Sequence, residues 1–127
     1  LAKAHSGPRE VLADEKFGTI RKFNLLVENN YREHHTVAYY AQQLNKSPKT
    51  LSNLFALYNH KTPLQVIQER LIIEAKRLLY YTDKSAKEIT YELGFDDAAY
   101  FSNFFKKHTS FSPTDFRNNK VLVAEGK

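Results

Sequence analysis

Two stretches of this sequence follow one pattern. Residues 37–63 read VAYYAQQLNKSPKTLSNLFALYNHKTP, and residues 86–113 read AKEITYELGFDDAAYFSNFFKKHTSFSP. Matching positions are 49 residues apart before the turn and 50 apart after it, because the second copy carries one additional residue there. The matches are Val37/Ala86, Tyr40/Ile89, Leu44/Leu93, Asn45/Gly94, Leu51/Phe101, Ser52/Ser102, Asn53/Asn103, Phe55/Phe105 and Pro63/Pro113.

Each copy of the repeat predicts a helix-turn-helix. Apolar residues recur at helical spacing on both sides of a turn residue, which is Asn45 in the first copy and Gly94 in the second. Both residue types adopt positive φ readily. We place the first helix-turn-helix at residues 36–58 and the second at residues 85–109. Two such units on one small basic chain make double-stranded DNA the leading partner.

The composition sets outer bounds on the function. A chain of 127 residues with 42% apolar residues can build one domain, or two very small ones that share a core. The net charge of +5 permits nucleic-acid binding without proving it. The absence of cysteine excludes disulfides and thiolate metal sites. No apolar run approaches the roughly 18–20 residues of a membrane span, and residues 1–16 lack the apolar core of a secretory signal.

We expect an all-α fold of seven helices, in which a long central helix over residues 63–81 joins the two helix-turn-helix units. The predicted domain covers residues 14–118, between a linker or tail at 1–13 and a C-terminal tail at 119–127. Its first helix begins at Asp14, because an apolar stripe follows at helical spacing. That stripe consists of Phe17, Ile20, Phe23, Val27 and Tyr31.

The expected helix starts are marked by capping residues. A hydroxyl residue precedes proline at Ser47, Thr62 and Ser112, and proline suits the first helical position because its missing N–H is not needed there. Thr36 and Ser85 can cap two further helices. The pairs Thr62 with Gln65 and Ser85 with Glu88 also fit the capping box. These hydroxyls are therefore interpreted as structural residues and not as nucleophiles.

The second helix of each copy has an outward face suited to the major groove. We expect one helix to bury Leu51, Leu54, Phe55 and Tyr58, and the other to bury Phe101, Phe104, Phe105 and His108. The outward residues are then Lys49, Ser52, Asn53 and Ala56, and Ala98, Ala99, Ser102, Asn103 and Lys106. Amides, hydroxyls and small apolar groups can read base edges. Either face alone would fit an ordinary solvated surface, but their repetition in matching places favours recognition.

The sequence resembles the AraC/XylS-type transcription regulators over about residues 17–118. Residues 94–117, GFDDAAYFSNFFKKHTSFSPTDFR, look like the signature of that family, and residues 70–79, RLIIEAKRLL, fit it too. The resemblance implies two helix-turn-helix units that control bacterial transcription, and hence a cytoplasmic activator or repressor that works without a cofactor. It also implies a separate effector or dimerisation domain. The chain has no Met and starts at Leu1, so we expect such a domain upstream in a longer polypeptide.

The resemblance also assigns base-contacting positions, with some departures. They fall on Lys49, Ser52 and Asn53 in the first unit, and on Ala98, Ala99, Ser102 and Asn103 in the second. Arginine is common in the family where Asn53 and Asn103 stand, so an adenine contact or weaker readout is expected here. The alanines at 98 and 99 suggest that the second unit reads sequence weakly. Ser110 occupies a turn position where glycine is usual.

Candidate phosphate contacts flank the two recognition helices. They are Lys46, Ser47, Lys61, Lys106 and Lys107. For any one lysine a plain solvated position is an equally good interpretation, because lysine side chains are nearly always exposed.

Three other functions compete with DNA binding. A metal site is disfavoured because no two of the five histidines are three or four residues apart in one predicted helix. An enzyme would need a nucleophile–base pair or a cluster of metal ligands, and the sequence shows neither. Asp96 and Asp97 resemble an acid pair, but they stand at a helix start, where capping explains them. The remaining alternative is a helical protein-interaction module whose eight tyrosines contact another protein such as RNA polymerase.

Overall fold

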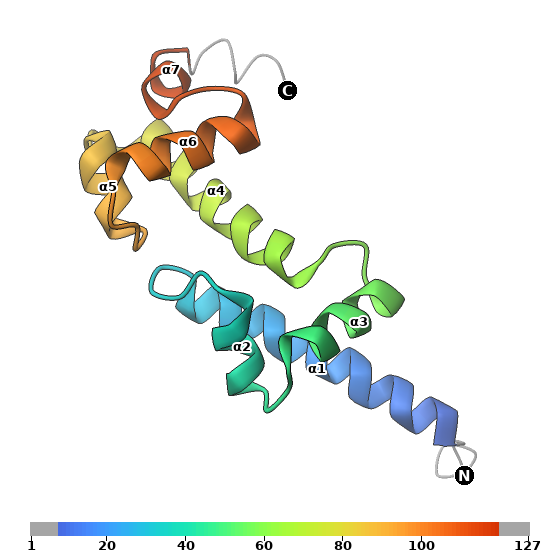
Figure 1. Cartoon of the computed structure of the whole chain (residues 1–127). Coiled ribbons are helices and arrows are strands. Elements are labelled where there is room, and N and C mark those ends of the chain that lie inside the picture. The colour runs from blue at the N-terminus through green and yellow to red at the C-terminus, as the bar shows by residue number, and fades with distance from the viewer. Residues whose placement is uncertain (1–7, 120–127) are drawn as a thin grey trace. The chain divides into compact units, whose positions relative to one another are not determined.

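The computed structural model describes the backbone of residues 8–119 and the side chains of residues 15–119. The described part of the chain forms seven α-helices and no strand (Figure 1). In chain order they are α1 (Pro8–Asn30), α2 (Val37–Gln43), α3 (Pro48–Tyr58), α4 (Pro63–Tyr81), α5 (Ala86–Glu92), α6 (Ala98–Thr109) and α7 (Pro113–Asn118). The expected all-α class with seven helices is confirmed, as is the central helix over residues 63–81.

The first helix starts earlier than expected. α1 begins at Pro8, whereas the sequence pattern predicted a linker or tail over residues 1–13 and a helix start at Asp14. Proline fits the first turn of a helix, so Pro8 opens α1 instead of marking a linker. Residues 1–7 of the expected linker and residues 120–127 of the expected tail lie outside the described residues.

The chain divides into two compact units. Unit 1 contains α1, α2, α3 and the start of α4 up to Ile67, and unit 2 contains Tyr31–His34, the rest of α4 from Gln68, and α5 to α7. In unit 1, α3 packs on α1 and α2 (Figure 1). Its core is aromatic, because the fully buried Phe23 ring makes edge contacts with Tyr40 at 5.5 Å and Phe55 at 5.0 Å between ring centroids.

Unit 2 has its own aromatic core. The rings of Phe101 and Phe105 on α6 are fully buried, and Phe105 makes an edge contact of 5.5 Å with Phe116 of α7. Phe95, in the turn before α6, lies 5.2 Å from Phe101. The second helix-turn-helix is thus fixed by ring packing on both sides of its recognition helix.

The capping predictions are confirmed. The hydroxyls of Thr36, Ser47, Ser85 and Ser112 accept hydrogen bonds from backbone N–H groups three residues later. Both capping boxes are formed: Thr62 and Gln65 exchange side-chain and backbone bonds of 3.1 and 2.8 Å, and Ser85 and Glu88 bonds of 3.0 and 2.8 Å. These hydrogen bonds set where each short helix begins.

A buried carboxylate anchors unit 2. Glu74 of α4 is 3% exposed, and its Oε2 accepts a 2.7 Å hydrogen bond from Arg32. Arg77 donates to the other oxygen at 3.0 Å, and Arg70 lies 3.7 Å away. Arg32 also binds Glu92 of α5 at 2.8 Å. One ion cluster thereby ties the segment Tyr31–His34 to α4 and α5.

The cluster shifts the titration of its carboxylates. Hydrogen bonding to Arg77 lowers the pKa of Glu74 against the opposing effect of burial. Hydrogen bonds from Lys84 and then Arg32 lower the pKa of Glu92. Both carboxylates are therefore held in the charged form around neutral pH.

Positive φ occurs at both turn residues for which the sequence predicted it, and also at Ser110. Asn45 and Gly94 turn their units with φ of 57° and 85°, and Ser110 ends α6 with φ of 74°. The Phe95 N–H next to Gly94 donates to the Thr90 carbonyl at 3.0 Å, so the turn is also hydrogen-bonded. In this left-handed region any side chain with a Cβ is disfavoured, and a β-branched one most of all.

Gly94→Val is expected to destabilise the chain by about 1–3 kcal/mol, because a β-branched residue is strained at positive φ. Gly94→Asn is the matched control and should cost clearly less, since asparagine already holds the equivalent turn at Asn45. Urea unfolding followed by far-UV circular dichroism measures both free energies. Equal stability of the two variants would contradict this account of the turn.

Candidate nucleic-acid interface

The first candidate recognition helix, α3, is positioned from its N-terminus. The Ser47 hydroxyl accepts the Thr50 N–H at 3.0 Å and donates to the Thr50 Oγ1 at 2.9 Å, and Pro48 fills the first helical position. Leu51, Leu54 and Phe55 are buried as expected. Tyr58 was also expected to be buried but is only partly so, because it lies at the end of the helix; its ring packs edge-on against Phe17 of α1 at 4.9 Å.

The opposite face of α3 is accessible. Lys49, Ser52 and Asn53, the three base contacts predicted for the first unit, are all exposed, and Ala56 continues their stripe. The structure thus presents an amine, a hydroxyl and an amide on one side of a helix whose other side is buried in unit 1. Their contact with bases remains a prediction.

The second candidate recognition helix, α6, has a similar arrangement. The Asp97 carboxylate caps it by accepting the Ala99 N–H at 3.3 Å. Among the predicted base contacts, Ala99 and Asn103 are exposed, whereas Ala98 and Ser102 are half-buried. The accessible groups of this face are therefore mainly the Ala99 methyl group, the Asn103 amide and the Lys106 ammonium group.

His108 is a correction to the predicted buried face of α6. It was expected to point inward with Phe101, Phe104 and Phe105, but it is exposed. The reason is its place in the last turn, beyond the core, where a polar ring meets water and packs on Phe104 at 4.7 Å. Phe104 itself is half-buried, and only Phe101 and Phe105 are fully buried.

The predicted phosphate contacts are exposed on both units. Lys46 lies in the turn before α3 and Lys61 in the segment after it, while Lys106 and Lys107 occupy the last turn of α6. Ser47 is exposed too, but its hydroxyl already serves the helix cap.

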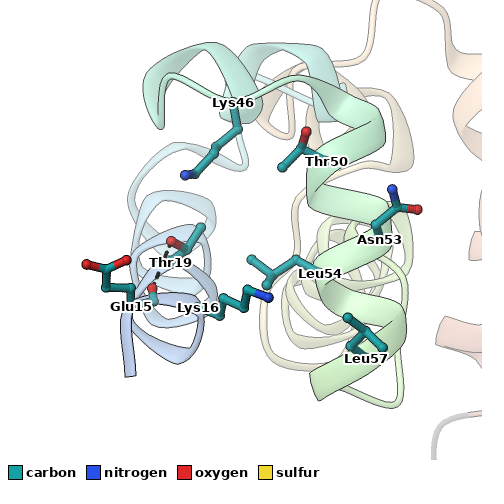
Figure 2. A pocket seen from close by; sticks show the side chains of 8 residues that line it. All are labelled: Glu15, Lys16, Thr19, Lys46, Thr50, Asn53, Leu54 and Leu57. Carbon is teal, nitrogen blue, oxygen red and sulfur yellow. Dashed lines mark hydrogen bonds between the residues drawn. The ribbon is translucent and has the colours of Figure 1, made fainter. Parts of the chain in front are cut away.

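A groove beside α3 was not predicted from the sequence. It has a volume of about 370 Å³ and lies between α1 and α3, with Lys46 entering from the turn between α2 and α3 (Figure 2). It is lined by Glu15, Lys16, Thr19, Lys46, Thr50, Asn53, Leu54 and Leu57. Of these, only Lys46 and Asn53 were among the candidate site residues, because the groove depends on how α1 packs against α3.

The described residues contain neither a metal site nor a membrane-spanning helix. Among the side chains that the structure describes, those of residues 15–119, no group of three or more His, Cys, Asp or Glu is placed to hold a metal ion. In the same part of the chain, no helix is both long and apolar enough to cross a membrane.

Comparison with known proteins identifies the family. The sequence profile of a family described as "Helix-turn-helix domain" matches residues 40–119. The chain is also 31% identical over 85 residues to the HTH-type transcriptional activator RhaS of Salmonella arizonae. The chain belongs to the AraC-type helix-turn-helix DNA-binding domains. This family consists of DNA-binding domains of transcription regulators and not of enzymes, which confirms both the resemblance and the expected absence of catalysis.

Solved structures share the fold of this AraC-type domain. The C-terminal domain of the two-component response regulator yesN from Fusobacterium nucleatum has a TM-score of 0.74 at 25% identity, covering 79% of this chain and 98% of that one. The DNA-binding domain of AdpA, a global transcriptional factor crystallised with a target DNA, has a TM-score of 0.71 at 21% identity, covering 81% and 93%.

The match to RhaS covers 67% of this AraC-type domain but only 31% of RhaS. The chain therefore spans about a third of the length of the curated relatives that it matches.

Proposed function

We propose that this chain binds duplex DNA sequence-specifically for a bacterial transcription regulator, with α3 and α6 in successive major grooves. The observation that carries the proposal is the repeated outward face: the exposed Ser52 and Asn53 on α3 correspond to the half-buried Ser102 and the exposed Asn103 on α6. An α-helix fits the major groove, where each base pair presents a distinct pattern of donors and acceptors. A solvated surface without function gives no reason for the same pair to recur.

We assign each outward side chain a role from its chemistry. The Asn53 amide can bond adenine N6 and N7 together, Lys49 can donate to guanine O6 or N7, and Ser52 suits either partner. On α6, Asn103 and Ser102 repeat the polar pair, and Ala98 and Ala99 offer methyl groups to thymine. Since Ala98 and Ser102 are half-buried, we propose that α3 contributes more to base recognition than α6 does.

Positive side chains supply the contacts that are independent of base sequence. Lys46 and Lys61 flank α3, and Lys106 and Lys107 end α6. Their ammonium groups can neutralise phosphates on either side of a recognition helix, and Ser47 can add a hydroxyl. Binding should consequently weaken as salt rises.

The wider setting is proposed from the relatives. RhaS is a transcriptional activator and AdpA binds a target DNA, which supports a role for this chain in activating transcription in the bacterial cytoplasm. An effector or sensor domain would occupy the additional length found in the relatives. Contact with RNA polymerase is a further part of the proposal, for which Tyr100 and Tyr91 provide aromatic surface at 62% and 52% exposure. Cross-linking to purified polymerase tests that contact.

Asn53→Ala tests the base-reading role. A preferred duplex is first selected from a random library with the wild-type chain, and binding is then measured by fluorescence anisotropy on that duplex and on random DNA. We expect Asn53→Ala to lose about 1–3 kcal/mol, or roughly 5- to 150-fold in affinity, on the preferred duplex only, through relaxed discrimination at one base pair.

The control for this experiment is Asn24→Ala, which removes an exposed amide from α1 and should leave both affinities unchanged. Equal weakening of Asn53→Ala on preferred and random DNA would assign Asn53 a non-specific role. Failure of the wild-type chain to bind any duplex would refute the proposed function itself.

A further inference from the structure

The groove between α1 and α3 adjoins the base-reading face directly. Thr50, Asn53, Leu54 and Leu57 line its α3 wall at helical spacing i, i+3, i+4 and i+7. The base-reading stripe, which begins at Lys49, is the same pattern shifted by one residue, or about 100° around the helix. Asn53 belongs to both sets. The groove is therefore the flank of the recognition helix and not a separate face of unit 1.

Two ammonium groups enter this groove. Figure 2 shows Lys46 reaching from the turn before α3 toward α1, and Lys16 reaching from α1 toward α3. The one acidic residue of the lining, Glu15, points away from α3, and its backbone carbonyl accepts the Thr19 hydroxyl at 3.0 Å (Figure 2). The interior of the groove is thus positive, with the hydroxyls of Thr19 and Thr50 on its two walls.

Lys16 is held in place by aromatic packing. Its Nζ lies 5.8 Å from the centroid of the Tyr58 ring, near the end of α3. The Tyr58 ring is fixed in turn by the edge contact of 4.9 Å with Phe17, the next residue of α1. A cation over an aromatic face is favourable, so the half-buried Lys16 is oriented across the groove instead of extending freely into solvent.

We propose that this groove seats a phosphodiester group of the DNA strand beside α3, and that Lys16 of α1 donates to that phosphate together with Lys46. The inference rests on the proposed function, because it needs α3 in the major groove. It adds a contact from outside the helix-turn-helix, at a residue for which no base-reading or phosphate role was predicted.

The dimensions of DNA favour this occupant. The major groove is about 12 Å wide, and a helix with its side chains is about 10–12 Å across. The flanks of an inserted helix therefore face the two phosphate strands. On the flank that forms the groove, the ammonium groups of Lys16 and Lys46 point inward and the Glu15 carboxylate points outward. This flank complements a phosphate better than an apolar protein segment, although Leu57 lies at the rim with 70% exposure.

The test is the salt dependence of binding by Lys16→Gln. Each neutralised phosphate contributes about 0.9 to the slope of log K against log salt. Because Lys46 stays at the shared phosphate, we expect Lys16→Gln to lower that slope by up to about 0.9 on both preferred and random duplexes. Between 50 and 200 mM salt the variant should thus lose up to about three- to fourfold less affinity than the wild-type chain. Anisotropy titrations at several salt concentrations measure the slope.

Two matched variants complete the design. Lys16→Arg keeps the charge and should retain the wild-type slope. Arg21→Gln removes a charge from an exposed position of α1 that lies about 200° around the helix from Thr19, and it should change nothing. If the wild-type chain binds DNA and Lys16→Gln has the slope of Arg21→Gln, the groove takes another occupant and this inference is overturned while the proposed function stands. If the wild-type chain does not bind DNA, both are overturned.

Discussion

Glu74→Ala is expected to lower the free energy of unfolding by about 3 kcal/mol at neutral pH. The carboxylate is 3% exposed and is the shared acceptor of Arg32 and Arg77, with Arg70 beside it. Removing one partner of a buried ion pair typically costs about 3–5 kcal/mol, because the remaining charges lose their counter-ion. We expect the lower end of this energy range, because the Arg32 and Arg77 side chains are 34% and 53% exposed and can turn toward water.

The same carboxylate predicts a pH dependence. Hydrogen bonding to Arg77 lowers the pKa of Glu74 below the ordinary 4.5, so its contribution to stability is present above that value and is lost as the pH falls through the lowered pKa. The unfolding free energy of the wild-type chain should therefore decline below about pH 4.5 more steeply than that of Glu74→Ala. Urea unfolding at several pH values on both sides of this range measures the difference.

The control for Glu74→Ala is Arg77→Ala, which removes one exposed partner and leaves Glu74 with Arg32 and Arg70. Water screens the ion pair of an exposed partner, so this variant should remain close to wild type. Glu74 does not hold the ion cluster together if Glu74→Ala is no less stable than Arg77→Ala. The same conclusion follows if the unfolding free energies of both variants depend on pH as that of the wild-type chain does.

Local features of the fold were predictable from the sequence. Each capping serine or threonine acts within three residues, so Ser47, Ser85 and Ser112 mark the starts of their helices through short-range chemistry alone. The turn residues Asn45 and Gly94 were identified for the same reason, since positive φ is a property of the residue itself. The early start of α1 was missed because Pro8 suits both a linker and a first helical turn.

Features that join distant segments were not predictable. The ion cluster brings Arg32 to partners 42 and 60 residues away, and no periodicity encodes that pairing. One local clue existed: Glu74 stands in an otherwise apolar stripe of α4, with Arg70 and Arg77 four residues before and three residues after it. Lys16 offered no such clue, because only the packing of α1 on α3 turns it toward the recognition helix.

Inserting about five base pairs between the two half-sites is expected to reduce the affinity of the chain at least tenfold. The insertion rotates one half-site by half a turn of the duplex. Both helix-turn-helix units adjoin α4 in the chain, and α4 runs without a break for 19 residues, or about 28 Å. This length approaches the roughly 34 Å between successive major grooves on one side of DNA, so we predict that a single chain reads two sites one turn apart.

Two further duplexes decide how the units share the binding. An insertion of about ten base pairs restores the rotation but doubles the separation. We predict that affinity stays low on this duplex, because its half-sites lie one turn further apart than the spacing predicted for a single chain, although DNA bending absorbs small mismatches. Five base pairs added outside the half-sites should have no effect. If affinity survives the internal insertion undiminished, only one unit engages DNA. The idle unit would then be the second, because Ala98 and Ser102 are half-buried and leave α6 fewer groups than the exposed Lys49, Ser52 and Asn53 give α3.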